Sequence, residues 1–100
     1  MARMLTATIV IVSFGIAGAV QAAGNAVAGK DKSAVCAGCH GEKGQGVGSY
    51  PALAGKPESD LLKALEDFKS GRTSPLMHGL AASLSDQDME DLAAYYASLK

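Results

Sequence analysis

One short motif constrains this chain more than any other feature: Cys36-Ala37-Gly38-Cys39-His40. C-x-x-C-H is the pattern of covalent haem attachment. The spacing has a geometric reason, because two thiols three positions apart on a helical turn can reach the two vinyl groups of one porphyrin. His40 then follows beneath the ring, where an imidazole nitrogen can bind iron. The motif predicts one haem c, attached through Cys36 and Cys39 and bound by His40.

Three other interpretations of the motif explain less of the sequence. A thioredoxin-like redox pair would need a strand before the motif and a βαβ unit around it, and neither pattern is present. Zinc would need a fourth ligand, which His78 could supply, but no second C-x-x-C or H-x₃₋₅-H pair accompanies it. The remaining alternative is a free or disulfide-bonded cysteine pair beside an ordinary surface histidine.

The first 22 residues have the features of a secretory signal peptide. Arg3 is their only charge, an apolar run covers residues 5–19, and small residues surround Ala22. This pattern predicts cleavage after Ala22 and export to the periplasm, and a cut after Ala19 or Ala23 fits nearly as well. An uncleaved anchor is the alternative, but a membrane span needs roughly 20 apolar residues. The folded domain is predicted over residues 23–100.

The remaining sequence predicts an all-α domain of three to four helices wrapped around one haem. Apolar residues recur at helical spacing over residues 25–39, 59–70 and 85–99. Asn25 can cap the first of these helices, Gly71 can end the second, and Ser85-x-x-Asp88 resembles a capping box for the third. Residues 41–55, with five glycines, and residues 72–84 are predicted to be irregular.

Composition excludes one class of partner and supports the presence of a cofactor. The 9 Lys and Arg residues are balanced by 10 Asp and Glu residues, so there is no basic face for nucleic-acid binding. Aromatic residues make up only 5% of the chain and Trp is absent. A domain of this size forms a marginal core from its own side chains, and a large apolar disc such as haem would complete it.

Several segments together resemble a small class I cytochrome c, of the bacterial c553 type or one half of a di-haem cytochrome c4. The resemblance covers the domain and is carried by Gly29, Cys36-x-x-Cys39-His40-Gly41, Tyr50-Pro51-Ala52-Leu53-Ala54-Gly55, Phe68-Lys69-Ser70-Gly71-Arg72, Met77, Leu84-Ser85-Asp86-Gln87-Asp88 and Leu92-Ala93-Ala94-Tyr95-Tyr96-Ala97. The sequence contains a single C-x-x-C-H motif, which indicates one haem.

Met77 is the predicted sixth ligand of the iron. It lies between Pro75 and Gly79, where a loop could hold a thioether over the haem, and it matches the axial methionine of the family. The neighbouring His78 is a chemically stronger ligand, so bis-histidine coordination is the alternative. Met89 falls on the apolar stripe of the last predicted helix, which is typical of core packing.

The resemblance also implies supporting roles for residues outside the motif. The carbonyl of Pro51 resembles the family's acceptor for the second ring N–H of His40, although Pro51 can also be a plain turn residue. Arg72 resembles a residue near the haem propionates, and a solvated surface role is the alternative. Tyr96 is expected to pack near Gly29, where the first and last helices cross in the family.

These features predict an exported electron carrier that is not an enzyme. Its expected partners are redox proteins such as an oxidase, a reductase or a dehydrogenase, with no small-molecule substrate and with membrane association only through those partners. One alternative is an electron-transfer subunit of a larger dehydrogenase, for example a sulfide-oxidising flavoprotein complex. The other is a peroxidase or gas-binding haem protein, which needs an open sixth position that Met77 would fill.

Overall fold

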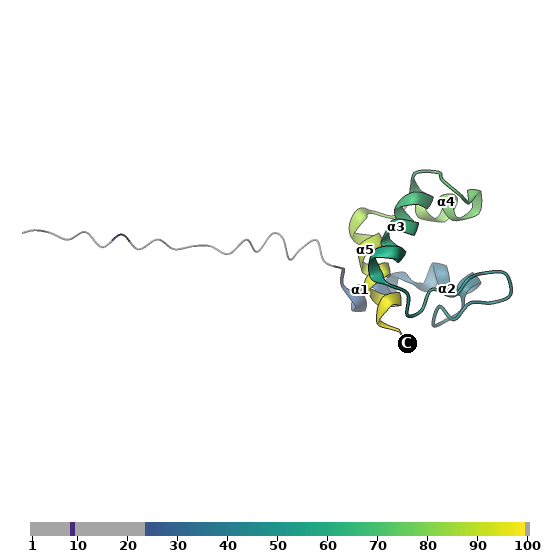
Figure 1. Cartoon of the computed structure of the whole chain (residues 1–100), viewed down its shortest axis with the longest axis horizontal. Helices are drawn as coiled ribbons and strands as arrows, with labels where there is room; N and C mark the ends of the chain where they lie inside the picture. Colours follow the sequence, from purple (N-terminus) through teal and green to yellow (C-terminus); the bar gives the residue numbers. More distant parts are fainter. Residues whose placement is uncertain (1–8, 10–23, 100) are drawn as a thin grey trace, which may run out of the picture.

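The computed structural model describes Ile9 and residues 24–99, and this part of the chain is all-α, as predicted (Figure 1). Its five helices are α1 (Ala26–Lys32), α2 (Ala34–His40), α3 (Glu58–Lys69), α4 (Pro75–Ala81) and α5 (Asp86–Ser98). Its only strand-like pairing is an isolated bridge between Val47 and Tyr50. No helix in this part is long and apolar enough to cross a bilayer. The predicted signal peptide, residues 1–22, lies outside the described residues apart from Ile9.

The structure has five helices rather than three to four, partly because the first predicted helix is divided at Ser33. The Ser33 hydroxyl donates a hydrogen bond to the Lys30 carbonyl at 2.6 Å, and the Ser33 N–H donates to the same oxygen at 3.2 Å. A serine that bonds back to the preceding turn competes with the helical ladder and bends the chain. The division separates α1 from the short helix α2, which carries the C-x-x-C-H motif.

The second difference is α4, which lies within the segment 72–84 that was predicted to be irregular. Ser74 caps this helix by accepting a hydrogen bond from the Met77 N–H at 3.2 Å, and Pro75 occupies its first turn. Proline is favoured there because its fixed φ suits the helix and its missing N–H has no partner to lose. Pro75 therefore starts a helix, and Gly79 is tolerated inside it at a cost of about 1 kcal/mol.

Helices α1 and α5 cross closely at Gly29. A Cβ atom on Gly29 would lie 1.9 Å from the carbonyl oxygen of Asp91 and 2.7 Å from the Cβ of Tyr95. Tyr95, rather than the predicted Tyr96, is thus the tyrosine whose Cβ comes close to Gly29. The Tyr96 ring instead lies against Gly44, where an added Cβ would be 2.6 Å from the ring. Neighbouring residues on a helix point about 100° apart, so only one tyrosine can face α1 directly.

A buried carboxylate also joins α1 to α5. Asp91 is 2% exposed and accepts hydrogen bonds from the backbone N–H of Asn25 at 2.8 Å, the Lys32 ammonium at 2.6 Å and the Gln87 amide at 2.8 Å. Lys32 also pairs with Asp88 at 2.8 Å. A buried charge is tolerated only when it is paired and hydrogen-bonded in this way.

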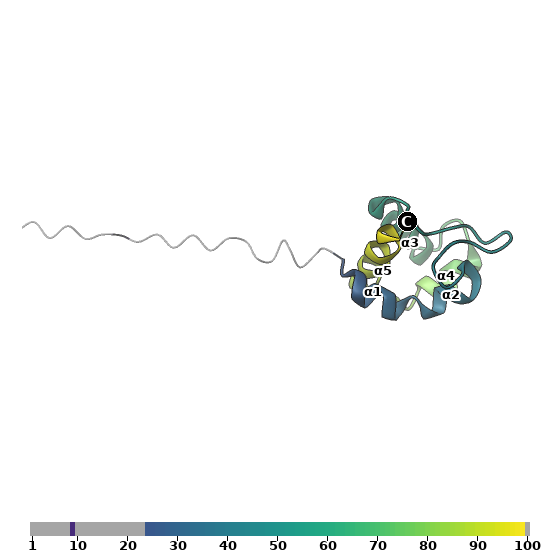
Figure 2. The same cartoon turned by 90° about the horizontal axis from the view of Figure 1, so that it is seen from below.

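The last helix forms the centre of the domain. Ser85 and Asp88 cap α5 reciprocally, so the capping box predicted at its start is confirmed. Met89, Leu92 and Ala93 are almost fully buried along it. Helices α1 and α3 both pack on α5, and α4 packs on α3, while α2 leads away from α1 toward the other side of the domain (Figures 1 and 2). This arrangement leaves α2 and α4 on opposite sides of a space.

Candidate functional site

The last turn of α2 brings the three residues of the motif together. Cys36 and Cys39 are half-buried free cysteines one helical turn apart, and His40 is 6% exposed. Gly41 then ends the helix with a φ of 93°, a conformation that favours glycine because it has no Cβ. The chain can therefore turn sharply after His40 and return across its ring.

The His40 ring is held by the loop that follows α2. Its Nδ1 atom lies 2.7 Å from the carbonyl oxygen of Pro51. A carbonyl oxygen can only accept, so Nδ1 carries the proton and donates, and the lone pair of the neutral ring is on Nε2. Tyr50 covers the same ring edge-on, with the ring centroids 6.1 Å apart and an angle of 69° between their planes. The arrangement fixes the imidazole with one nitrogen free to bind a metal.

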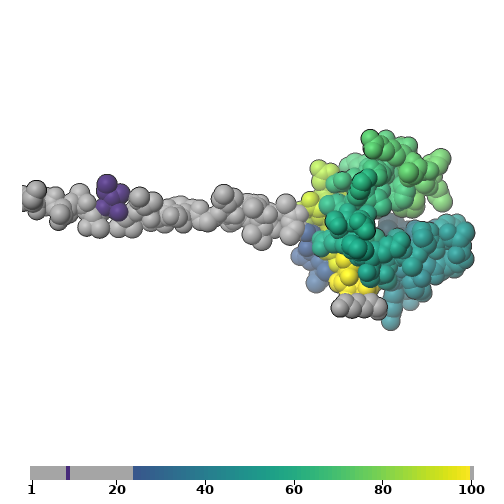
Figure 3. Space-filling model, in the orientation of Figure 1, coloured from purple at the N-terminus to yellow at the C-terminus, as the bar shows by residue number. Residues whose placement is uncertain are grey.

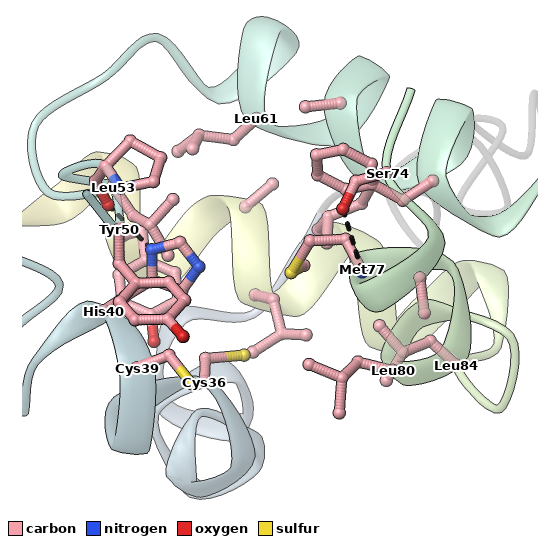
Figure 4. A pocket seen from close by; sticks show the side chains of 18 of the residues that line it. Cys36, Cys39, His40, Tyr50, Leu53, Leu61, Ser74, Met77, Leu80 and Leu84 are labelled. Atoms are coloured by element: carbon pink, nitrogen blue, oxygen red, sulfur yellow. Dashed lines mark hydrogen bonds between the residues drawn. The ribbon is translucent and has the colours of Figure 1, made fainter. Parts of the chain in front are cut away.

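Met77 lies on the opposite side of the same space. It is half-buried on α4, and its sulfur points toward the His40 ring across the cavity in Figure 4. The neighbouring His78 is exposed, and its Nδ1 atom lies 2.8 Å from the Phe68 carbonyl oxygen at the end of α3. Of the two candidate sixth ligands, Met77 therefore lines the cavity and His78 faces away from it.

Between these two sides is a cavity of about 520 Å³. The surface is visibly hollowed between the green segment of α4 and the blue-teal segment of α2 and its loop (Figure 3). Apolar residues from α3, α4 and α5 form about half of the lining, including Leu61, Leu65, Phe68, Leu80, Leu92 and Ala93. The volume lies in the range of about 300–1,000 Å³ that cofactor pockets occupy.

Leu61, Leu65 and Phe68, which recur at helical spacing along α3, face this cavity, and so does Tyr96 of α5. The Tyr96 hydroxyl is buried and has no hydrogen-bond partner among the described residues. Burial raises the pKa of Tyr96 above its usual value and also raises the pKa of the Cys36 thiol. Both groups are therefore neutral at physiological pH, and the cavity wall beside Cys36 carries no charge.

The donor set and the shape of this cavity fit a covalently bound haem. The described residues provide two thiols at the end of α2, a free imidazole nitrogen on one side, a thioether on the other and an apolar lining. The zinc alternative finds no support, because no cluster of three His, Cys, Asp or Glu residues occurs in the part of the chain that the structure describes. The thioredoxin alternative lacks its strand over the same residues.

Two other predicted residues lie away from the centre of the cavity. The Arg72 guanidinium is exposed, 3.8 Å from the Asp67 carboxylate, and is not among the residues that line the cavity. Met89 is buried in the core of α5. No motif in the sequence predicts a role for Tyr50, although its position next to Pro51 places it in the loop expected to contact His40.

Comparison with known proteins identifies the family. The sequence model described as "Cytochrome c" matches residues 21–100. Cytochrome c4 of Pseudomonas aeruginosa is 47% identical over 92 residues, which cover 90% of this chain and 46% of that protein. Cytochrome c-554(548) of Halomonas halodenitrificans is 41% identical over 81 residues, which cover 76% of this chain and 98% of that protein.

A solved structure has the same fold. Reduced recombinant cytochrome c4 from Pseudomonas stutzeri superimposes with a TM-score of 0.74 and 45% sequence identity, over 78% of this chain and 47% of that one. The chain thus spans about half the length of the cytochromes c4 that it matches. Because the match includes the Cys36-x-x-Cys39-His40 site, the cofactor is haem c. The chain belongs to the cytochrome c family, and its sequence and fold are similar to those of cytochrome c4.

Proposed function

We propose that this chain is an exported single-haem electron carrier in which His40 and Met77 are the two axial ligands of the iron. The observation that carries the proposal is the opposition of these two side chains across one apolar cavity. The His40 ring has its Nδ1 committed to the Pro51 carbonyl at 2.7 Å, which leaves Nε2 as its only metal-binding atom. Cys36 and Cys39 on the same helical turn are the proposed thioether residues.

The protein's own contribution is to hold the two ligands in place and to exclude water. When bound, haem c supplies an iron that changes by one electron between Fe(II) and Fe(III). The Pro51 carbonyl fixes the orientation of His40 and increases its basicity as a ligand. A Met77 thioether bound to the iron would favour the reduced state and raise the reduction potential. The apolar side chains around the cavity lower the local dielectric and act in the same direction.

Two protein ligands leave no open position for a substrate, so the proposed function is electron transfer without catalysis. A peroxidase or gas-binding protein would require one axial position to be vacant or easily vacated. The partners that suit such a carrier are other redox proteins, namely an oxidase, a reductase or a dehydrogenase. Arg72 is proposed as a contact of the haem propionates, and this proposal rests on the family resemblance alone.

Export to the periplasm is part of the proposal. It rests on the signal-peptide pattern of residues 1–22, with Arg3, the apolar run 5–19 and cleavage after Ala22. Residues 23–100 are then the mature cytochrome domain, and membrane association would occur only through its partners. The N-terminal sequence of the purified haem protein tests this point: Ala23 is expected as the first residue, and an N-terminus at Met1 would contradict it.

A second candidate function is that of an electron-transfer subunit in a larger dehydrogenase. A relative from Stutzerimonas stutzeri that is 44% identical over 62 residues is named "Thiosulfate dehydrogenase electron acceptor". By analogy with this name, a dehydrogenase of inorganic sulfur compounds is the proposed class of partner for this chain. A complex with a sulfide-oxidising flavoprotein would belong to the same class. Size-exclusion chromatography of the native protein separates the two functions, since a free carrier elutes as a small domain and a subunit elutes with its enzyme.

The attachment of haem is tested by extraction. Haem colour should stay with the protein in acid–acetone, and the pyridine haemochrome should be of the c type. Exchange of either Cys36 or Cys39 for Ala should leave one thioether, and exchange of both should leave mostly unfolded apoprotein because the remaining core is small. Haem that extracts completely from the parent protein would contradict the proposal.

A further inference from the structure

The helix that carries Met77 is held in the domain mainly through one neighbouring helix. Helix α4 has only seven residues, and among the described helices it packs chiefly against α3. A helix this short is unstable by itself, so its position depends on tertiary contacts. The place of the Met77 sulfur is therefore set by whatever holds α4 to α3.

His78 makes one of these contacts from the residue next to Met77. Because adjacent side chains on a helix point about 100° apart, Met77 faces the cavity while His78 projects toward the end of α3. The His78 Nδ1–H donates to the Phe68 carbonyl at 2.8 Å. The ring also lies over the turn after α3, since a Cβ on Gly71 would be 3.8 Å from its Cε1 atom.

The acceptor is well suited to this bond. Phe68 is in the last turn of α3, where carbonyl groups have no partner within the helix and where the helix dipole is negative. Its oxygen also accepts the Gly71 N–H at 3.0 Å, so His78 uses the second lone pair. The chain beyond α4 is tied to the same end of α3, because the Lys69 ammonium donates to the carbonyl of Leu84.

We propose that His78 is a positioning residue that fastens α4 to the C-terminal end of α3 and so holds the Met77 sulfur in the cavity. The inference rests on the proposed ligand role of Met77. The same bond keeps the His78 imidazole, a stronger iron ligand than a thioether, directed away from the cavity. The hydrogen bond from His78 to Phe68 therefore has two effects. It holds Met77 at the cavity, and it keeps the His78 imidazole out of the cavity.

The test compares three variants of the haem-loaded protein. His78→Ala removes the bond to Phe68 while favouring helix, since Ala has the highest helix propensity, so any loosening of α4 cannot come from a weaker helix. His78→Asn keeps an N–H donor close to the position of Nδ1 at a helix propensity similar to that of His. Ser83→Ala is the matched control, because its hydroxyl makes only a 3.4 Å contact with Leu80 in the same segment.

Two measurements are made on each variant: amide hydrogen exchange, and the denaturant concentration at which the sulfur–iron charge-transfer band of the oxidised protein disappears. In His78→Ala, exchange of the amide at position 78 of α4 and of the Ala82 amide, which caps the helix end, should be roughly two- to tenfold faster, the effect of losing one hydrogen bond. Exchange in α5 should be unchanged, and the band should be lost at lower denaturant. His78→Asn should lie close to the parent protein, and Ser83→Ala should match it.

Unchanged α4 exchange in His78→Ala would overturn the proposal, as would equal acceleration in Ser83→Ala. The exchange measurement is independent of which residue binds iron. A parent protein without the charge-transfer band would contradict Met77 as a ligand and with it the positioning role. Faster α4 exchange in His78→Ala would then still establish the bond to Phe68 as what fastens the helix.

Discussion

Met77 and Met89 lie only twelve positions apart, yet one lines the cavity opposite His40 and the other is 2% exposed in the core of α5. The thioether that lines the cavity is thus separated by the fold from the thioether that packs the helices. Methionine is used in proteins for both purposes, and only the surroundings of the sulfur distinguish them.

The two methionines should therefore respond differently to truncation. Met77→Ala is expected to abolish the sulfur–iron charge-transfer band of the oxidised protein and to lower the reduction potential. Met89→Ala should keep the band and lower the free energy of unfolding by about 2–5 kcal/mol, because it leaves a cavity in a packed core. Absorption spectra and denaturant titrations of both variants check this. A band that survives in Met77→Ala and disappears in Met89→Ala would reverse the assignment.

Gly29 and Gly79 lie on helices of seven residues, so replacing each by Ala compares a closely packed glycine with an open one. Gly29→Ala should destabilise the protein by about 1–3 kcal/mol or more, because its Cβ would lie 1.9 Å from the Asp91 carbonyl oxygen and the α1–α5 crossing would have to open. Gly79→Ala has nothing within 4 Å of the new Cβ and should stabilise α4 by about 0.5–1 kcal/mol. Denaturant unfolding measures both. Equal effects would mean that the crossing is not tightly packed.

Two carboxylates of α5 that pair with Lys32 of α1, Asp88 and Asp91, predict how stability falls in acid. Burial alone would raise the pKa of Asp91, but hydrogen bonds from Lys32, Asn25 and Gln87 outweigh it and the pKa is lowered from its usual 3.8. The hydrogen bond with Lys32, together with those from Ser85, lowers the pKa of Asp88 to about 2. A carboxylate with a lowered pKa in the folded state stabilises the fold above its ordinary pKa and loses this contribution as pH falls through the folded value.

The free energy of unfolding of the parent protein should therefore decline from about pH 4 toward pH 2. Asp91→Asn should be less stable at neutral pH and should lose less on acidification, because one of the titrating carboxylates is gone. Asp31→Asn, at an exposed position on α1, is the control and should run parallel to the parent. If the free energy of unfolding of Asp91→Asn and of the parent fell in parallel with pH, the Asp91 carboxylate would not determine acid stability.

The rim of the cavity predicts how partners dock. Val35, Leu76 and Leu80 line the cavity and are 62%, 58% and 40% exposed, so the surface beside the haem site is apolar. The chain as a whole has a net charge of only −1. Electron exchange with a redox partner should consequently change less than about tenfold from low to high salt. Stopped-flow rates measure this, and a steeper fall would reveal a charged docking face.

Much of this arrangement could be predicted from the sequence because it depends on local chemistry. The Cys36-x-x-Cys39-His40 spacing, the cap at Asn25 and the Ser85–Asp88 capping box each act within a few residues of the chain. The apolar stripe of α3 follows from helical periodicity in the same way. Short-range patterns of this kind are visible before any tertiary contact is known.

The features that the sequence did not predict depend on side-chain hydrogen bonds at helix ends or on contacts between residues distant in the chain. Ser33 lies inside a segment predicted as one helix, and the hydrogen bond of its hydroxyl to the Lys30 carbonyl competes with the helical ladder where the helix divides. Pro75 favours irregular structure when it is considered alone, whereas the cap from Ser74 places it in the first turn of a helix. The bond from His78 to Phe68 joins residues ten positions apart across two helices, and no local pattern specifies it.

If His40 and Met77 fill both axial positions, as proposed, the protein is an electron carrier and not a ligand-binding haem protein. Exposure of the reduced protein to carbon monoxide tests this most directly, with Met77→Ala as the positive control. With both positions filled, the absorption spectrum of the parent should stay unchanged, while that of Met77→Ala should shift at once. A prompt shift in the parent protein would contradict it.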